Sequence, residues 1–244
     1  MDQIIEINDL SKIFRIPHER RNTLKENFLN FHRKVKFEDF YALKNINLTV
    51  EKGDFIGIIG RNGSGKSTLL KIIANIYSPT IGKVIVNGSI SPFLELGVGF
   101  NGDLSARENV YLNGIILGLS RKEVDRKYKK IVDYAELADF MDMKLKNFSS
   151  GMQVRLAFSV AIQADADIYL CDEVLAVGDA SFQKKCYETF REFMKTGKTI
   201  IYVTHDLPSV KEFCNKTALL DHGAILSFGP TEEVVKKYLE SLDG

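Results

Sequence analysis

Residues 60–67 read GRNGSGKS and match the pattern G-x-x-x-x-G-K-[S/T] without a gap. Glycines let backbone N–H groups turn inward around phosphate oxygens, Lys66 reaches the outer phosphates as a point charge, and the Ser67 hydroxyl is a Mg²⁺ ligand. An apolar strand-sized run, Asp54–Gly60, precedes the match, and a helical segment, Thr68–Ala74, points its positive end at the anion. The sequence therefore predicts a nucleoside triphosphate site made by Gly60, Arg61, Asn62, Gly63, Ser64, Gly65, Lys66, Ser67 and Thr68.

Two further strand-sized runs end in polar residues. Asp167–Cys171 is followed by Asp172 and Glu173, and adjacent carboxylates at the end of a buried strand are costly unless they are used. Asp172 is expected to accept Mg²⁺, directly or through water, and Glu173 to polarise a water aimed at the γ-phosphate. A helix N-cap is the alternative for either acid. Thr199–Thr204 precedes His205, which is either a turn residue or a bridge between the γ-phosphate and the acids.

Composition excludes several classes of protein. The chain has 244 residues, of which 45% are hydrophobic and 27% charged, and Lys plus Arg (33) nearly balance Asp plus Glu (32), for a net charge of +1. Such a balance argues against wrapping nucleic acid over the whole surface. No apolar run approaches the ~18 residues needed to cross a bilayer, and the first residues lack the basic and apolar regions of a secretory signal. Three cysteines outside metal spacing are typical of reduced thiols in a cytosolic protein.

The order of elements predicts an α/β fold. Apolar runs without alternation are typical of strands buried on both faces of a parallel sheet, and helical segments follow them. Asn87-Gly88 between apolar residues predicts a hairpin over Val84–Ile90, which would add an antiparallel piece. Leu104–Leu145 is charged and periodic, which predicts a helical subdomain inserted between two halves of the sheet. Thr231–Leu242 predicts a short amphipathic helix that closes the fold.

A basic insertion is expected over residues 15–40, between a first strand at Ile4–Ile7 and Ala42. From Arg15 to Lys36 it holds seven Lys and Arg against two Glu, a net of +5. Leu24, Phe28 and Phe31 follow helical spacing within it. Two interpretations remain open: a solvated loop whose helix packs on the body, or a contact with a membrane surface or phosphate-bearing ligands.

Taken together, these residues resemble the ATP-binding subunit of an ABC transporter along nearly the whole chain. Residues 148–153 (FSSGMQ), placed between the two halves of the phosphate site, are similar to that family's signature loop, usually written LSGGQ. The resemblance implies a P-loop ATPase core with an antiparallel β subdomain and an inserted helical subdomain. It implies one domain over residues 1–244, with the Q-loop-like region, helical subdomain and signature loop at 91–160. It also implies that Ser149 and Gly151 touch the γ-phosphate of ATP held by a second copy, in a homodimer with two composite sites.

Other positions carry over from the same resemblance. Asp179 in Val177-Gly178-Asp179 is similar to the D-loop residue at the dimer interface, and His205 to the switch histidine that works with Glu173. Phe14 fits the aromatic that stacks on adenine, with Phe40 and Tyr41 as competitors. The family's Mg²⁺-binding glutamine is missing from residues 91–100, where Glu95 is expected to take its role; a surface turn acid is the alternative.

Four features together resemble one branch of the family, the exporters of bacterial cell-surface polysaccharides such as O-antigen, capsule and teichoic acid. They are the missing glutamine at 91–100, the ELGVGF run at 95–100, the Ser-Ser-Gly-Met signature and the FYALK run at 40–44. The resemblance implies ATP and Mg²⁺, a separate transmembrane permease, a lipid-linked polysaccharide, and a peripheral place on the cytoplasmic face of the bacterial cell membrane, with no nucleic acid. Some O-antigen members carry a further C-terminal β-domain, and no such domain is expected before Gly244.

Three alternatives remain. A soluble ABC-type ATPase of DNA repair usually separates its half-sites by a long coiled coil, and one of translation usually carries two nucleotide modules. A second alternative is an ABC transporter of another substrate. A P-loop kinase explains Lys66 and Asp172 but leaves the Ser-Ser-Gly loop without a role.

Overall fold

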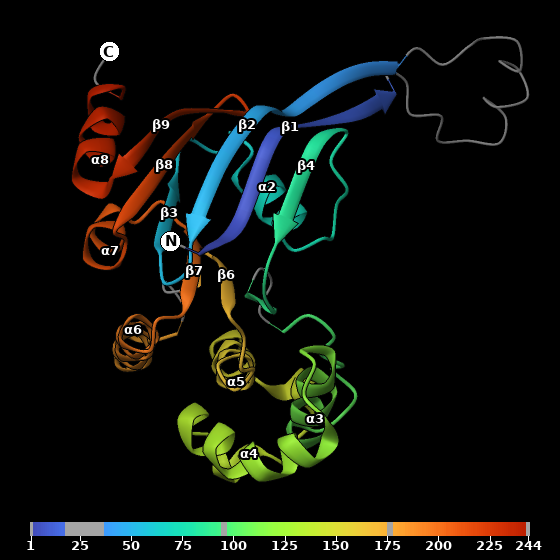
Figure 1. Ribbon diagram of the computed structural model, residues 1–244. Helices are drawn as coiled ribbons and strands as arrows, with labels where there is room; N and C mark the ends of the chain where they lie inside the picture. Colours follow the sequence, from blue (N-terminus) through green and yellow to red (C-terminus); the bar gives the residue numbers. More distant parts are fainter. Residues whose placement is uncertain (1, 18–36, 94–96, 175–177, 243–244) are drawn as a thin grey trace, which may run out of the picture.

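The strands form two sheets in the computed structural model, which describes residues 2–17, 37–93, 97–174 and 178–242 (Figure 1). One sheet is antiparallel in the order β2-β1-β4, and the other has the order β5-β6-β7-β3-β8-β9, in which β9 alone is antiparallel to its neighbour. Their bounds are β1 (Gln3–Pro17), β2 (Phe37–Glu51), β3 (Phe55–Ile59), β4 (Ile81–Val86), β5 (Ile90–Phe93), β6 (Ile168–Asp172), β7 (Thr199–Val203), β8 (Lys216–Asp221) and β9 (Ala224–Pro230). The predicted α/β class is confirmed.

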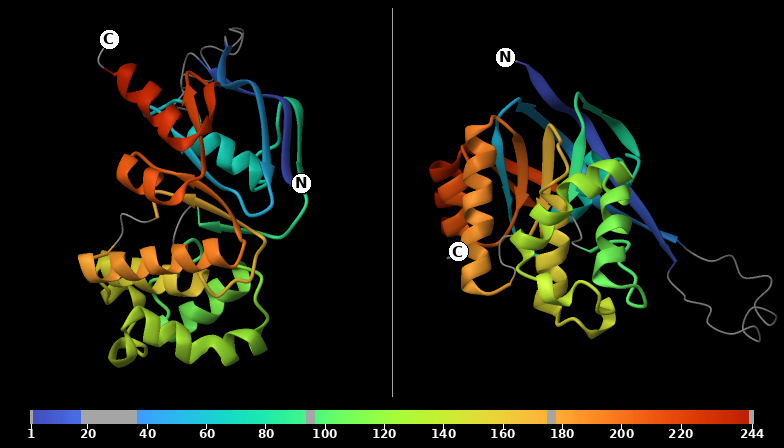
Figure 2. Two further views of the ribbon diagram at one scale, coloured as in Figure 1. Left: turned by 60° about the vertical axis from the view of Figure 1, so that its left-hand side comes forward. Right: turned by 90° about the horizontal axis from the view of Figure 1, so that it is seen from below.

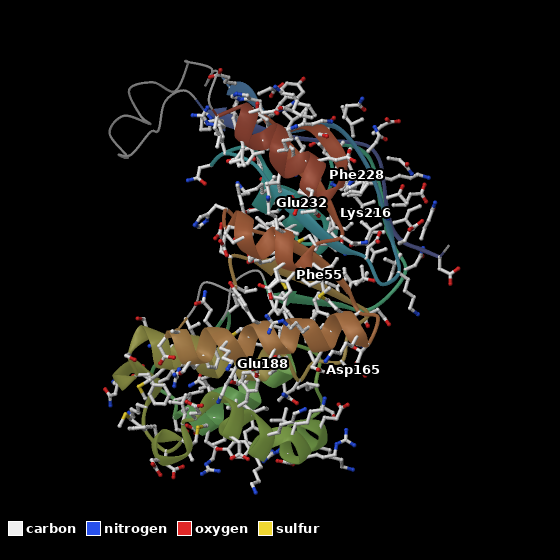
Figure 3. The ribbon with its side chains drawn as sticks, turned by 90° about the vertical axis from the view of Figure 1, so that its left-hand side faces the viewer. Phe55, Asp165, Glu188, Lys216, Phe228 and Glu232 are labelled. Carbon is white, nitrogen blue, oxygen red and sulfur yellow. The ribbon has the colours of Figure 1, made fainter. Side chains whose placement is uncertain are left out.

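Both faces of the larger sheet are covered, which explains why its central strands read as continuous apolar runs. All five residues of β3 are buried, and so are all five of β7. One face packs against the antiparallel sheet and α2. The other packs against four helices, and Phe55, labelled in Figure 3, contacts the rings of Phe190 and Phe213 there. The helices of these layers are α2 (Lys66–Ile73), α5 (Ser150–Ala161), α6 (Ala180–Lys195), α7 (Leu207–Phe213) and α8 (Thr231–Glu240).

The predicted helical subdomain is confirmed, and it lies below the sheets in Figure 1 and in the left view of Figure 2. It contains α3 (Ala106–Ile116), α4 (Arg121–Ala135) and two short 3₁₀ turns, Ala138–Phe140 and Leu145–Asn147. Capping boxes begin both α-helices, with Ser105 and Glu108 at α3 and Ser120 and Glu123 at α4. Helix α5 contributes to the apolar core of this subdomain and also to the core against the sheet, so it joins the two parts.

The hairpin predicted over Val84–Ile90 is wrong. Strand β4, before the Asn-Gly pair, is antiparallel to β1, whereas β5, after it, is parallel to β6 in the other sheet. Asn87 and Gly88 therefore carry the chain from one sheet to the other. Gly88 has φ 157°, and a Cβ there would lie 3.0 Å from that of Asp167. The close approach to Asp167, rather than a hairpin turn, explains this glycine.

The first strand is much longer than the predicted Ile4–Ile7. Pairing of β1 with β2 continues to Pro17 and Phe37, so both ends of the expected insertion at 15–40 are strand. Residues 18–36, with most of the basic charge and the Leu24, Phe28 and Phe31 pattern, lie outside the described residues. Among the helices that the structure describes, none has the length and apolar character needed to cross a membrane.

Candidate functional site

The phosphate loop joins β3 to α2, and its glycines occupy places where a side chain does not fit. Gly60 has φ 147°, and a Cβ there would lie 2.0 Å from the carbonyl oxygen of Leu220. Gly65 has φ 107°, and its Cβ would lie 2.6 Å from the carbonyl oxygen of Ala42. Gly65 is also the N-cap of α2 and gives the helix no side-chain cap. The first N–H groups of α2 are therefore directed into the loop, as anion binding requires.

Two polar side chains of this loop, Lys66 and Ser64, face the backbone of the loop or its interior. Lys66 donates from Nζ to the carbonyl oxygens of Gly60 (2.8 Å) and Arg61 (3.0 Å). Ser64 is buried, and its Oγ has no hydrogen-bond partner within the part of the chain that the structure describes. The loop is thus a backbone cradle in which one cation is held by carbonyl oxygens.

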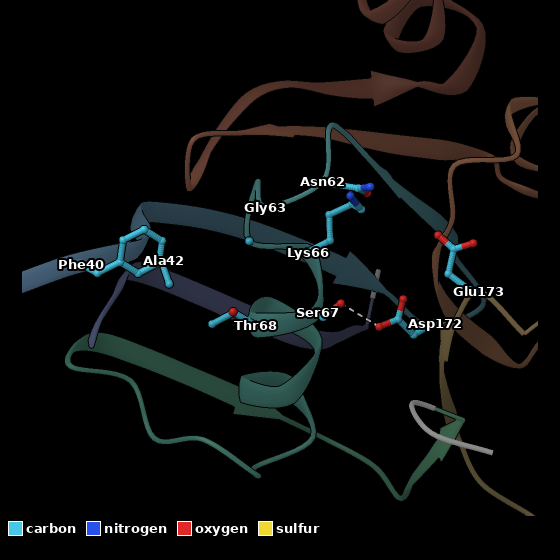
Figure 4. A pocket seen from close by; sticks show the side chains of 10 residues that line it. Phe40, Ala42, Asn62, Gly63, Lys66, Ser67, Thr68, Asp172 and Glu173 are labelled. Atoms are coloured by element: carbon cyan, nitrogen blue, oxygen red, sulfur yellow. Dashed lines mark hydrogen bonds between the residues drawn. The ribbon is translucent and has the colours of Figure 1, made fainter. Parts of the chain in front are cut away.

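The carboxyl ends of three adjacent parallel strands bring the predicted residues together. In the order β6-β7-β3, the phosphate loop follows β3, Asp172 ends β6 with Glu173 directly after it, and His205 follows β7. Ser67 Oγ donates to Asp172 Oδ2 at 2.8 Å, drawn as a dashed line in Figure 4. A pocket, called the phosphate-loop pocket here, is lined by Phe40, Ala42, Asn62, Gly63, Gly65, Lys66, Ser67, Thr68, Asp172 and Glu173.

Glu173 leaves the strand direction and turns toward the histidine. Its φ is 56°, the left-handed region that costs a non-glycine residue energy and is often found at functional sites. Its N–H donates to the carbonyl oxygen of Val203, the last residue of β7, and its carboxylate lies 2.8 Å from His205 Nδ1. The imidazole of His205 is otherwise exposed. The strained turn therefore presents a carboxylate that lines the pocket and holds the imidazole of His205 beside it.

Burial perturbs two charged groups of the pocket. It lowers the pKa of Lys66, although the charges of Glu173 and Asp172 act in the opposite sense. It also raises the pKa of Asp172, and the charge of Glu173 adds to this, against the hydrogen bond from Ser67. Both groups are therefore charged at a cost, which opposite charge brought by a ligand would offset.

A second pocket, called the signature pocket here, lies at the start of α5. Its lining residues are Ser149, Ser150, Gly151, Met152, Val154, Arg155, Gly178 and Asp179, and none of them lines the phosphate-loop pocket. Ser149 is the N-cap of α5 and accepts from Met152 N at 3.2 Å. Asp179 is the N-cap of α6 and also accepts from Arg155 Nη2 at 2.5 Å. One chain thus carries two separate pockets at helix N-termini.

The aromatic residues are arranged differently from the prediction. Phe14 and Phe40 are paired directly across β1 and β2, but only Phe40 lines the phosphate-loop pocket. Figure 4 shows Phe40 at one side of this pocket and Glu173 at the other. The ring of Phe14 contacts Tyr77 instead, with centroids 5.8 Å apart. Gly60 and Arg61 meet Lys66 through their carbonyl oxygens rather than line the pocket.

Two predicted positions lie outside the described residues, Glu95 and Val177. Sequence analysis missed Arg155, whose guanidinium touches Asp179 within the signature pocket. The available signal was its position in the sequence, directly after Val154 and two residues beyond the end of the signature loop. No sequence pattern indicated its partners.

Comparison with known proteins finds a family match and relatives that cover nearly the whole chain. The model of the ABC transporter family matches residues 43–176. The O-antigen export system ATP-binding protein RfbB of Myxococcus xanthus is 46% identical over 99% of this chain, which spans 56% of that protein. The protein of the same name in Klebsiella pneumoniae is 39% identical, with 99% and 100% of the two chains covered. The teichoic acids export ATP-binding protein TagH of Staphylococcus haemolyticus is 36% identical, with 99% and 90% covered.

Solved structures show the same arrangement of elements. The bacterial ABC transporter cassette MJ0796, in a dimeric structure, has a TM-score of 0.74 and 26% identity, with 93% of this chain and 99% of that chain covered. A dimeric post-hydrolysis state of the same cassette, bound to ADP and Pi, has a TM-score of 0.74 and 25% identity over the same shares of the two chains.

Replacing Asp172 by Asn is expected to raise the melting temperature of the nucleotide-free protein by a few degrees at about pH 8. Burial raises the folded-state pKa of Asp172 above its ordinary value, so its ionisation opposes folding. The stability it contributes is fully present below the unfolded pKa and is lost as pH rises through the folded pKa. Thermal unfolding in chelator from about pH 4 to pH 8 measures this, and the two curves should converge at the acid end. A lower melting temperature for Asp172→Asn at the alkaline end contradicts the assignment.

Proposed function

The chain belongs to the ABC transporter family, and we propose that it is the ATP-hydrolysing subunit of an exporter of a cell-surface polysaccharide. One observation carries the enzymatic part. The phosphate loop, the Ser67–Asp172 hydrogen bond and the Glu173–His205 pair meet at the carboxyl edge of three adjacent parallel strands. This edge offers N–H groups and Lys66 to phosphate, oxygen donors to a hard cation, and a carboxylate to water.

The donor set fits Mg²⁺. Ser67 Oγ and Asp172 Oδ2 lie 2.8 Å apart and are both oxygen atoms, the ligands that this ion prefers. Among the residues that the structure describes there is no group of three or more His, Cys, Asp or Glu suited to a metal. Mg²⁺ usually takes one or two protein ligands and completes its shell with phosphate and water. When bound, the ion neutralises charge that develops on the phosphates.

Hydrolysis requires that the chain's own groups bind the triphosphate and orient water. Lys66 exchanges the carbonyl oxygens of Gly60 and Arg61 for phosphate oxygens. Glu173 accepts a hydrogen bond from the attacking water, and His205, at 2.8 Å from its carboxylate, fixes its orientation. The left-handed turn at Glu173 supports this role because it directs the carboxylate away from the strand.

The composite site follows from the second pocket. Ser149, Gly151 and Asp179 line a pocket apart from the phosphate loop of their own chain, and Ser149 and Gly151 place the N-terminus of α5 there, where it can bind an anion. A head-to-tail pair of chains would close two equal sites, each with the phosphate loop of one and the signature loop of the other. The similar cassette MJ0796 has been solved as a dimer, which supports this arrangement.

Mixing two inactive variants is expected to restore ATPase activity. Glu173→Gln removes the group that orients water, and Gly151→Asp places a like charge where the γ-phosphate binds. Aspartate at a helix N-terminus is tolerated, and a Cβ at Gly151 meets nothing closer than 4.0 Å, so this variant should fold. In the mixed dimer one site combines the two intact halves, so random mixing yields up to about a quarter of wild-type activity. Steady-state phosphate release measures the recovery.

The result depends on the two halves coming from different chains. If both halves lay in one chain, mixing would leave activity at the level of the separate variants. Near-normal turnover of Glu173→Gln alone would remove this residue from its role. Each variant assayed alone at the same total protein concentration gives the background.

We assign adenine stacking to Phe40, which lines the phosphate-loop pocket, in place of Phe14. Phe40→Ala is expected to weaken ATP binding about tenfold, the order of one lost base–aromatic stack. Phe14→Ala is the matched control, because the two residues are paired across β1 and β2, and it should bind ATP as the wild type does. Titration with a fluorescent ATP analogue measures both, and a larger loss for Phe14→Ala would return the assignment to Phe14.

The export role rests on relatives that cover nearly all of this chain. Those named for O-antigen export and those named for teichoic acid export are 36–46% identical to it over 99% of its length. We infer a separate transmembrane permease, a lipid-linked polysaccharide as cargo and a peripheral place on the cytoplasmic face of the cell membrane. Glu95 would contribute to Mg²⁺ binding and to the contact with the permease.

Cells that lack the chain are expected to lose surface polysaccharide and to accumulate its lipid-linked precursor inside. The wild-type gene should restore export, whereas Glu173→Gln should not, since this chain would bind ATP without hydrolysing it. Labelled precursor on the two sides of the membrane is the measurement. If the deletion strain kept its surface polysaccharide while the purified protein hydrolysed ATP, the proposed cargo would be excluded and the proposed ATPase activity would stand.

A further inference from the structure

Glu136 occupies a position that ordinarily suits glycine. It follows α4 directly as the C-cap, with φ 57° and ψ 43°, in the left-handed region. Helices often end in this conformation, and Gly is the usual residue because a Cβ makes it costly. A carboxylate at this place needs a use that offsets that cost.

Its contacts supply one. Glu136 Oε2 accepts from Arg155 Nη1 at 3.4 Å, and Oε1 accepts from Lys185 Nζ. The other arm of the guanidinium, Nη2, donates to Asp179 Oδ2 at 2.5 Å. The Arg155 side chain is only 16% exposed, and its guanidinium lies over the ring of buried Phe182 at 5.3 Å. Arg155 is therefore held between two carboxylates and above an aromatic ring.

Arg155 and Asp179 belong to the signature pocket. Arg155 lies on α5, whose N-cap is Ser149, and Asp179 begins α6 by accepting from Phe182 N at 2.9 Å. The chain of contacts Glu136–Arg155–Asp179 thus ties α4, α5 and α6 together beside the residues that meet phosphate. Without the Glu136 carboxylate, Arg155 keeps only Asp179 as a carboxylate partner in this chain of contacts. The guanidinium is then no longer held on the α4 side and can shift together with Asp179.

We propose that Glu136 is a positioning residue for the signature half of the composite ATP site, acting through Arg155 to fix the start of α5 against Asp179. This inference rests on the proposed function, because it assumes that the signature pocket completes the site of a second copy. The competing interpretation is that Glu136 and Arg155 form an ordinary surface ion pair. Such pairs contribute little to stability. The two interpretations differ in what happens to turnover when the fold is intact.

The test compares two replacements of Glu136 with a matched control in the full chain. Glu136→Gln removes the charge, and Glu136→Gly removes the carboxylate while suiting the left-handed backbone. Glu212→Gln breaks the Arg191–Glu212 pair, in which the glutamate is 39% exposed against 45% for Glu136. Both Glu136 variants are expected to lower kcat about tenfold, as misplaced catalytic partners do. Glu136→Gly should melt no lower than the wild type, and Glu212→Gln should turn over normally.

Mixing with Glu173→Gln assigns the defect to one half of the site. The Glu173→Gln chain brings an intact signature half to the intact phosphate loop of Glu136→Gly, so activity should rise about fivefold above the mean of the two variants assayed alone. Wild-type turnover in both Glu136 variants overturns the inference. So does a loss that mixing fails to relieve while the Gly151→Asp and Glu173→Gln pair recovers. If that pair also fails, the composite site itself is wrong and both proposals fall.

Discussion

The site depends on one constraint: charged side chains are partly buried at the carboxyl edge of the parallel strands. Lys66, Asp172 and Glu173 line one pocket, and burial disfavours the charged forms of the first two. Within the chain this cost is relieved only in part, by carbonyl oxygens at Lys66 and by the Ser67 hydroxyl at Asp172. A polyphosphate with a divalent cation supplies both missing partners at once. The edge is therefore electrostatically incomplete in a way that selects its ligand.

The topology explains why these groups meet. Parallel strands end at the same edge, so loops that are far apart in sequence converge there, and the order β6-β7-β3 places the acids, the histidine and the phosphate loop side by side. The signature pocket uses the same physics at a different helix, α5, and shares no lining residue with the first. A helix N-terminus directed at solvent is half of an anion site, and a second copy with the same two halves can complete it without any new chemistry.

Patterns local in sequence predicted which residues meet at the sheet edge, whereas features that depend on tertiary placement were not predicted. GRNGSGKS, the Asp172-Glu173 pair and His205 each follow a buried strand, so their convergence follows from fold class alone. The Asn87-Gly88 turn was mispredicted because a turn signal does not specify which sheet the next strand joins. Phe14 and Phe40 were ambiguous because they are paired across two strands, and only their tertiary contacts separate them: Phe40 lines the phosphate-loop pocket, whereas Phe14 packs against Tyr77. Arg155 contacts residues 19 and 24 positions away, beyond any local pattern.

The helical subdomain is fastened at both ends by polar contacts around one apolar core. At one end, buried Asn109 and Asn113 of α3 bind the loop after β5, through Asn101 and the carbonyl oxygen of Val98. At the other end, the Glu136 and Arg155 pair reaches Asp179 at the start of α6. Because α3, α4 and α5 share one apolar core and such cores are closely packed, a displacement of one of these helices disturbs the packing of the other two. Val98 and Asn101, which are hydrogen-bonded to α3, are therefore connected through this core to α5, at whose N-terminus the signature pocket lies.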